Sequence, residues 1–286
     1  MHVPRPRVHI FQIYYSAETR QALDGRYMPL DNQSNERPDW REYWPIRRYF
    51  LENPPVDGDY YGFLSPAFAR KTRLASETVF SFLDAHTPKA DVVLFSPFYD
   101  QTAFFLNQWE QGIMAHKADS FAFEASLALL APEFQLYETV GCSRNSVFCN
   151  YFVAKGAFWS EWFARCERIF HCAERGDTAL GRALGGRVDY NAHLAPIKVF
   201  IIERVACALL ATQPRWSVSA YNSMLLPFSG SFISTLGAQL AALDALKIAY
   251  LSERHDQYLQ AFFSLRAQFA QSARKAAATG NTQTGS

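Results

Sequence analysis

Residues 91–100, with the sequence DVVLFSPFYD, decide the fold. The run from Val92 to Phe95 is apolar at every position, which is typical of a strand buried on both faces in a parallel sheet. The run stops at Ser96-Pro97, where serine suits a helix N-cap and proline suits the first helical turn. We therefore predict a strand, a sharp turn and a helix.

The same pattern occurs earlier in the chain, in YYGFLSPAF at residues 60–68. Two units of strand, Ser-Pro and helix indicate a βα architecture. Ligands of open α/β sheets bind beyond the carboxyl ends of the strands. This rule places four side chains near a candidate site, namely Ser65, Ser96, Tyr99 and Asp100. Alternatively, the two serines are helix caps without a chemical role.

Composition narrows the class of protein. The 286 residues can bury a large core in one domain or in two closely joined halves. Apolar residues make up 49% of the chain and the formal net charge is +1, which argues for a globular protein and against a strongly basic nucleic-acid binder. The five cysteines contain no Cys-x-x-Cys pair, so we expect reduced thiols in a cytoplasmic protein.

Membrane attachment, if any, is expected to be peripheral. No apolar signal core follows the N-terminus. The most apolar later segment, Val199 to Ala211, is interrupted by Glu203-Arg204 and is too short to span a bilayer.

The N-terminal half carries two further strand candidates, at residues 9–15 and 27–32. Residues 35–50 are dense in aromatic side chains and arginines. Because planar guanidinium groups bind phosphate bidentately, three arginines could meet a diphosphate, namely Arg41, Arg47 and Arg48. The alternative is an amphipathic helix whose arginines are solvated or paired with nearby carboxylates, namely Glu36, Asp39 and Glu42.

The rest of the chain alternates helical and strand-like segments. We predict helices over residues 66–86, 101–116, 119–130, 157–174 and most of 231–273, and strands over 146–154 and 216–221. A polar, Gly-rich connection is expected from 176 to 188, and a disordered tail from 276 to 286.

The dipeptide Glu203-Arg204 stands out because its predicted helix, over residues 196–211, is apolar nearly all round. Burying a carboxylate and a guanidinium is costly unless they are paired or used. Two alternatives stay open. The two side chains form a structural ion pair, or Glu203 faces a polar pocket where a raised pKa lets it act as a base.

The order of these segments resembles bacterial glycosyltransferases of the GT-A type, in particular those of capsule and O-antigen polysaccharide synthesis. The similar features are a first strand ending in Gln12, Tyr14 and Tyr15, an Asn–Trp/Tyr–Arg segment over 35–50, and a Tyr-Tyr-Gly-Phe strand at 60–63. They continue with Asn-Tyr-Phe-Val and an aromatic helix at 150–163 and with Phe-Ile-Ile-Glu-Arg at 200–204. The resemblance implies a Rossmann-like, mostly parallel central sheet flanked by helices, with a helical C-terminal part.

The resemblance also implies which part of the chain binds each substrate. Residues 1–117 would bind a nucleotide-sugar donor, with a UDP-sugar favoured, and residues 118–230 a glycan or lipid-linked acceptor, followed by C-terminal helices over 231–275. The expected donor contacts are Gln12, Tyr14, Tyr15, Asp31, Asn32, Arg47, Tyr61, Ser96 and Pro97. The expected acceptor contacts are Asn150, Tyr151, Trp162 and Arg204.

The implied chemistry needs a cation and, for inversion, a base. Enzymes of this type usually keep Asp-x-Asp at the strand end near Phe95 for Mn²⁺ or Mg²⁺, whereas this sequence has only Asp100 there. Arginines or helix N-termini are the alternative means of neutralising the leaving diphosphate. If configuration inverts, Glu203 is the first candidate for the base that deprotonates the acceptor and Asp100 the second. A retaining reaction needs no such base.

A second function class stays open: a non-catalytic module that binds sugars or a partner enzyme in a polysaccharide assembly. No Gly-x-Ser-x-Gly elbow and no phosphate-binding Gly-x-x-x-x-Gly-Lys-Ser/Thr loop occurs, so neither an α/β-hydrolase nor a P-loop NTPase is predicted. We expect a cytoplasmic protein that does not bind nucleic acid, with the inner face of the cytoplasmic membrane as the alternative location.

Overall fold

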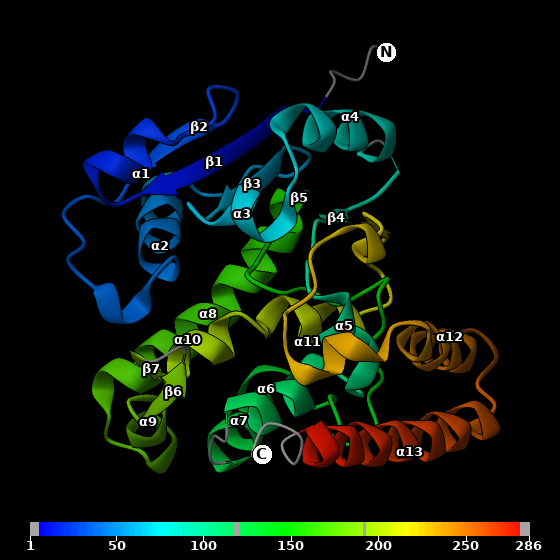
Figure 1. Cartoon of the computed structure of the whole chain (residues 1–286). Helices are drawn as coiled ribbons and strands as arrows, with labels where there is room; N and C mark the ends of the chain where they lie inside the picture. The colour runs from blue at the N-terminus through cyan, green and yellow to red at the C-terminus, as the bar shows by residue number, and fades with distance from the viewer. Residues whose placement is uncertain (1–5, 88, 117–119, 191–192, 281–286) are drawn as a thin grey trace.

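A six-stranded sheet with the strand order β2-β1-β3-β5-β4-β8 is the centre of the computed structural model (Figure 1). The structure describes residues 6–87, 89–116, 120–190 and 193–280. The six strands are β1 (Val8–Tyr14), β2 (Met28–Asp31), β3 (Tyr60–Leu64), β4 (Val92–Leu94), β5 (Phe152–Lys155) and β8 (Val218–Ala220). Only β5 runs antiparallel to its neighbours, so the sheet is mostly parallel, as the sequence predicts.

The two strands predicted from the Ser-Pro units are buried at every residue. Their side chains alternate between two apolar cores, because successive residues of a strand point to opposite faces of the sheet. Tyr60 and Leu64 of β3 belong to one core, and Phe63 belongs to the other. Continuous apolar runs are therefore the expected signature of these strands.

Helices cover both faces of the sheet (Figure 1). On one face, α3 (Phe68–Thr72) and α4 (Ser76–His86) contribute side chains such as Phe68 and Val79. On the other face, α2 (Tyr43–Glu52), α8 (Gly156–Arg175) and α11 (Val205–Thr212) build the larger core, which includes Trp159 and Trp162.

The C-terminal helices form a third core. Helices α12 (Ala238–Glu253) and α13 (Asp256–Gly280) pack with α5 (Tyr99–Phe104) through buried residues such as Leu240, Leu243 and Phe262. The remaining elements are α1 (Ala17–Gln21), η1 (Pro38–Trp40), α6 (Gln108–His116), α7 (Ser120–Leu130), α9 (Ala179–Leu184), β6 (Arg187–Tyr190), β7 (His193–Pro196), α10 (Ile197–Ile202), η2 (Ser223–Leu225) and η3 (Phe232–Leu236). Within the described residues, no helix has the length and apolar character needed to cross a bilayer.

Several predicted elements are shorter or divided in the structure. The helix expected over 66–86 is two helices, because Arg73 adopts a left-handed conformation with φ of 57°. The helix expected over 196–211 ends at Ile202 and restarts at Val205. The helix expected over 101–116 is divided between α5 and α6, and the strand expected over 146–154 is β5. Residues 35–50 form η1 and most of α2.

The Ser-Pro caps were a wrong prediction. Helix α5 begins after Phe98, which has a φ of 66°, and the Ser96 hydroxyl accepts a hydrogen bond from the Phe148 amide at 2.9 Å. The Ser65 hydroxyl lies 2.5 Å from the Tyr151 hydroxyl. Both serines therefore hold the strand ends to the segment that leads into β5.

The segment over 176–188 and the C-terminal residues also differ from expectation. The segment over 176–188 contains α9, which the Thr178 hydroxyl caps, and the start of the β6–β7 hairpin. Helix α13 continues to Gly280, so residues 276–280 are helical, and 281–286 lie outside the described residues.

Candidate functional site

A polar cleft lies at the carboxyl edge of the sheet, at the point where the strand order reverses. From β1 the chain passes first to β2 on one side and then to β3 on the other. Open α/β sheets bind ligands in the crevice outside such a switch point. The cleft has a first lobe of about 270 Å³ and a second lobe of about 470 Å³, which share Tyr15, Arg41, Glu42 and Pro66.

The two lobes differ in lining. The first lobe adds Asn32 and Asn35, which follow β2. The second adds side chains from the end of β3 and from α3, from α10 and the residue after it, and from the loop after η2, namely Ser65, Arg70, Lys71, Val199, Phe200, Glu203, Phe228 and Ser229. A small end pocket of about 30 Å³ continues from the second lobe and reaches Cys149 and Asn150.

The cleft mixes cations and carboxylates. Arg41, Arg70 and Lys71 line it together with Glu42 and Glu203. Three positive charges and two negative ones favour an anionic ligand, because side chains in a recess act in a lower dielectric than water. Arginine also offers a fork of donors that matches a phosphate.

Backbone strain is concentrated around the cleft. Of the seven non-glycine residues with positive φ in the described chain, five line it, with φ values of 41° at Asn35, 47° at Arg41, 66° at Phe98, 60° at Cys149 and 54° at Asn150. Such conformations cost about 1–3 kcal/mol each and collect at functional sites. The surrounding fold therefore holds these residues in place at a cost in stability.

Two buried amide oxygens of the cleft have no protein partner. Asn32 is 5% exposed and lines the first lobe, while Asn150 is 8% exposed and lines the end pocket. Neither side-chain oxygen accepts a hydrogen bond within the described structure. Buried polar atoms in folded proteins nearly always have a partner, so each oxygen can accept a hydrogen bond from a ligand or a water molecule.

Glu203 occupies the break between α10 and α11, and this break turns its carboxyl group into the cleft. Burial raises the pKa of this carboxyl, and nearby Glu42 adds to the effect, against Arg204, Lys71 and Arg41. A raised pKa makes a carboxylate a stronger base. Glu203 therefore faces a polar pocket with a raised pKa, and its action as a base stays a prediction.

Cys149 and Lys71 meet near Glu203. The Lys71 ammonium lies 3.1 Å from the Cys149 sulfur. Burial raises the pKa of the Cys149 thiol to about 12 in spite of this neighbour. Cys149 is thus a neutral thiol near pH 7 and has little nucleophilic character.

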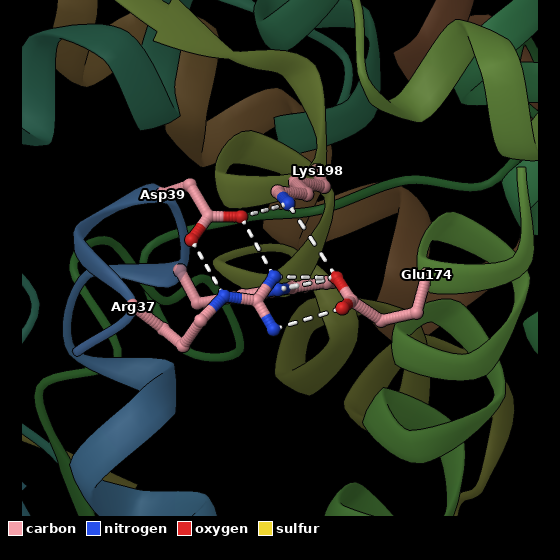
Figure 2. A network of polar contacts seen from close by, with 5 residues as sticks. Arg37, Asp39, Glu174 and Lys198 are labelled. Carbon is pink, nitrogen blue, oxygen red and sulfur yellow. Dashed lines mark hydrogen bonds and ion pairs between the residues drawn. The ribbon is translucent and has the colours of Figure 1, made fainter.

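An ion-pair network fixes the loop that carries Arg41 and Glu42 (Figure 2). The Arg37 guanidinium donates to Asp39 at 3.0 Å and to Glu174 of α8 at 2.6 Å, and the Lys198 ammonium of α10 donates to Asp39. Burial opposes ionisation of Asp39, but hydrogen bonds from Arg37 and Lys198 outweigh it and lower its pKa to about 2. The network joins the loop to α10, the helix that ends just before Glu203, and so links two walls of the cleft.

The structure brings together part of the predicted site. Tyr15, Asn32 and Asn150 line the cleft with Glu203. Arg41, which was expected to meet a diphosphate, lines it as well.

Asp100 lies elsewhere. It is fully buried and accepts hydrogen bonds from the Ser229 amide at 2.9 Å and from the hydroxyls of Ser229 and Ser234. This environment favours a structural role that holds the loop after η2, in place of the base or metal ligand expected from the sequence. Among the described residues, no group of three or more His, Cys, Asp or Glu side chains could hold a metal ion.

Several other predicted donor contacts do not line the cleft. Arg47 is paired with Glu167 of α8 at 2.7 Å, so its expected role as a diphosphate ligand is replaced by a structural ion pair. Gln12 accepts a hydrogen bond from the Asp24 amide at 2.9 Å. Five more predicted contacts are not among the residues that line the cleft, namely Tyr14, Asp31, Tyr61, Ser96 and Pro97.

Three predicted acceptor contacts are core residues. Tyr151 and Trp162 are fully buried. The Arg204 guanidinium donates to the carbonyl of Gln108 at 2.7 Å, to that of Phe200 at 2.8 Å and to the Gln111 side chain at 2.6 Å. It therefore joins α10 to α6.

Sequence reasoning missed Arg70 and Lys71 as cleft cations and took Glu42 only as a partner of arginines. The rule that selected Ser65 could have found the two cations, because they lie in the first turn of the helix that follows β3, at the same edge of the sheet.

Comparisons with protein-family models, with curated proteins and with solved structures return no match.

Proposed function

We propose that this chain is a GT-A-like glycosyltransferase that moves a sugar from a nucleotide-sugar donor, with a UDP-sugar favoured, to a hydroxyl group of a glycan or lipid-linked acceptor. One observation carries the proposal. At the switch point of a mostly parallel sheet, a single cleft holds the cations Arg41, Arg70 and Lys71 beside Glu203, whose pKa is raised.

These parts match the needs of the reaction. The nucleoside diphosphate leaves with growing negative charge, which the three cations would stabilise without a reorganisation of water. Glu203 would take the proton of the attacking hydroxyl, in a reaction that inverts configuration. Mn²⁺ or Mg²⁺ could supply part of the positive charge, and Glu42 and Glu203 are the carboxylates that line the cleft.

The lobes suggest where each substrate lies. The first lobe, with Tyr15 and the unpartnered oxygen of Asn32, would hold the nucleoside of the donor. The second lobe would hold the diphosphate and the sugar. Asn150 and the loop after η2 would face the acceptor. A cytoplasmic location, where surface-polysaccharide precursors are assembled, is part of the same proposal.

A thermal-shift panel of nucleoside diphosphates, with and without Mn²⁺, and of free sugars tests this function. One nucleotide should stabilise the protein, since a ligand at ~100 times its dissociation constant adds ~2.7 kcal/mol to the free energy of unfolding. A response to sugars alone would favour the alternative of a non-catalytic sugar-binding module. No response to any nucleotide would overturn the transferase.

A variant pair locates the binding nucleotide. Arg70→Ala removes a cation of the cleft, and the loss of a charge-assisted hydrogen bond, about 1.5–3 kcal/mol, should weaken binding about tenfold or more. Arg73→Ala is the matched control, because Arg73 ends the same helix and is exposed outside the cleft. Equal affinities of the two variants would show that the nucleotide binds elsewhere.

A further inference from the structure

A second cavity, of about 580 Å³, opens beside the cleft and has a different character. It is a groove between α5, α6, η3 and α13, with walls formed by Phe104, Met114, Phe232 and Phe263. Three of these side chains are open to solvent: Met114 is 60% exposed, Phe232 57% and Phe263 37%. An apolar recess of this size is typical of a binding site.

The polar side chains of the groove are already engaged. The Gln101 amide nitrogen donates to the hydroxyls of Ser229 at 3.0 Å and Ser231 at 2.9 Å, and its oxygen accepts from Gln111 at 3.2 Å. The Arg266 guanidinium is paired with Glu110 at 2.8 Å. The groove therefore offers apolar contact and few hydrogen bonds, which suits a hydrocarbon chain better than a sugar.

The groove adjoins the cleft across a seam of hydroxyl groups. Ser229 lines the cleft and Ser231 lines the groove, and their hydroxyl oxygens are 3.0 Å apart. Residues two apart in a chain are separated by at most about 7 Å. Gln101 bonds to both serines and holds the seam in place. One elongated molecule can therefore lie in both recesses.

We propose that the groove binds the hydrocarbon chain of an amphipathic acceptor whose polar head lies in the cleft. This inference rests on the proposed function, because it selects the lipid-linked class of acceptor for the same site. The last residues of the chain, Asn-Thr-Gln-Thr-Gly-Ser at 281–286, have no apolar side chain and are poor candidates for the groove.

A series of n-alkyl β-D-glucosides tests the groove by calorimetry, at concentrations below micelle formation. Affinity should rise about three- to fourfold for each added methylene from hexyl to dodecyl, which corresponds to ~0.8 kcal/mol per methylene. Equal affinities along the series would overturn the proposal.

Two tryptophan variants of α13 test whether the hydrocarbon chain of the glucoside lies in the groove. Ala267→Trp fills the groove and should abolish the dependence on chain length, whereas Gln268→Trp, at an exposed neighbouring position outside the groove, should preserve it. If Ala267→Trp does not fold, Phe232→Ser on the opposite wall serves instead and should weaken dodecyl glucoside binding. If the groove variants bind dodecyl glucoside as tightly as the wild type does, the assignment is contradicted.

The nucleotide panel and the glucoside series together separate the possible failures. If nucleotides bind and alkyl chains do not, the transferase stands and the groove assignment falls. If alkyl chains bind in the groove and nucleotides do not, the proposed function falls, and with it the acceptor role of the groove. Sedimentation of the wild type and Ala267→Trp completes the test, because a dimer that the variant loses would assign the groove to a second copy of the chain.

Discussion

Glu203 and Arg204 are neighbours in sequence with different surroundings. The break between α10 and α11 lets Glu203 line the cleft while Arg204 is 4% exposed and donates to backbone carbonyls. An uninterrupted apolar helix would have to bury both charges on its own surface. Because of the break, the two charges are not buried side by side on an apolar helix, and the Glu203 carboxyl lines the cleft with a raised pKa.

Glu203→Gln tests the base. The substitution keeps the shape of the side chain but removes its ability to accept a proton, so sugar transfer should fall about 10²–10⁴-fold with nucleotide binding unchanged. In the wild type, the rate should fall with acidification at a higher pH than for an ordinary glutamate, because the raised pKa protonates the base earlier. Initial rates over a pH series measure both effects.

Glu42→Gln is the matched control for this variant, since Glu42 lines the same cleft. Removing its charge should leave the base in place and shift the acidic limb of the profile to lower pH, because Glu42 raises the pKa of Glu203. Unchanged turnover in Glu203→Gln would eliminate Glu203 as the base.

Among the elements, the loop before α2 depends on contacts made far away in sequence. Asp39→Asn should destabilise the protein at pH 7 by about 1–2 kcal/mol, because it removes the charge whose ion pairs lower the pKa of Asp39. Solvent reaches this side chain and weakens these ion pairs. The folded-state pKa lies below the unfolded value, so this stability is present above about pH 4 and is lost as pH falls toward 2. Urea unfolding of wild type and variant at pH 7 and pH 3 measures it.

Asp177→Asn controls for a general charge effect, because its partner Arg175 lies 3.7 Å away and both side chains are more than 60% exposed. It should change stability little. If the two variants behave alike, the network in Figure 2 does not fix the loop.

Elements with a local signature could be predicted, and those set by distant contacts could not. The helix expected over 157–174 is observed as Gly156–Arg175, because its apolar residues recur at helical spacing and Gly176 ends it in a left-handed conformation. The partner of Arg47 is 120 residues away, and no local pattern marks it.

The same limit applies to the site. The rule that ligands bind at strand ends selected Ser65, which lines the cleft, whereas Tyr15, Asn32 and Asn150 were expected from the family resemblance alone. Asp100 also follows a strand, yet the segment carrying Ser229 and Ser234 packs against it and donates hydrogen bonds to both oxygens of its carboxylate. Which strand ends stay open to solvent depends on how distant loops pack, and the sequence pattern does not show this.

At the scale of the whole molecule, one buried lysine joins the C-terminal helices to the sheet domain. Lys247 of α12 is fully buried and donates to the carbonyls of Thr102 at 2.5 Å and Phe105 at 2.7 Å, at the end of α5. Helix α5 also carries Gln101, which lines the groove and donates a hydrogen bond to Ser229 of the cleft. Lys247 thus helps to hold the seam between the two recesses.

The pKa of Lys247 makes this contact sensitive to pH in a defined direction. Burial lowers the pKa to about 8 in the folded protein, below the value of 10.5 for an exposed lysine. The cost of the buried charge is therefore present below about pH 8 and is relieved as pH rises toward 10.5, because the unfolded chain then binds more protons than the folded one. The stability of the wild type relative to Lys247→Met should increase by about 1–2 kcal/mol between pH 8 and 10, measured by urea unfolding. A difference that stays constant or falls over this range would show that the folded protein does not lower the pKa of Lys247, because its bonds to the carbonyls of Thr102 and Phe105 then offset the cost of burial.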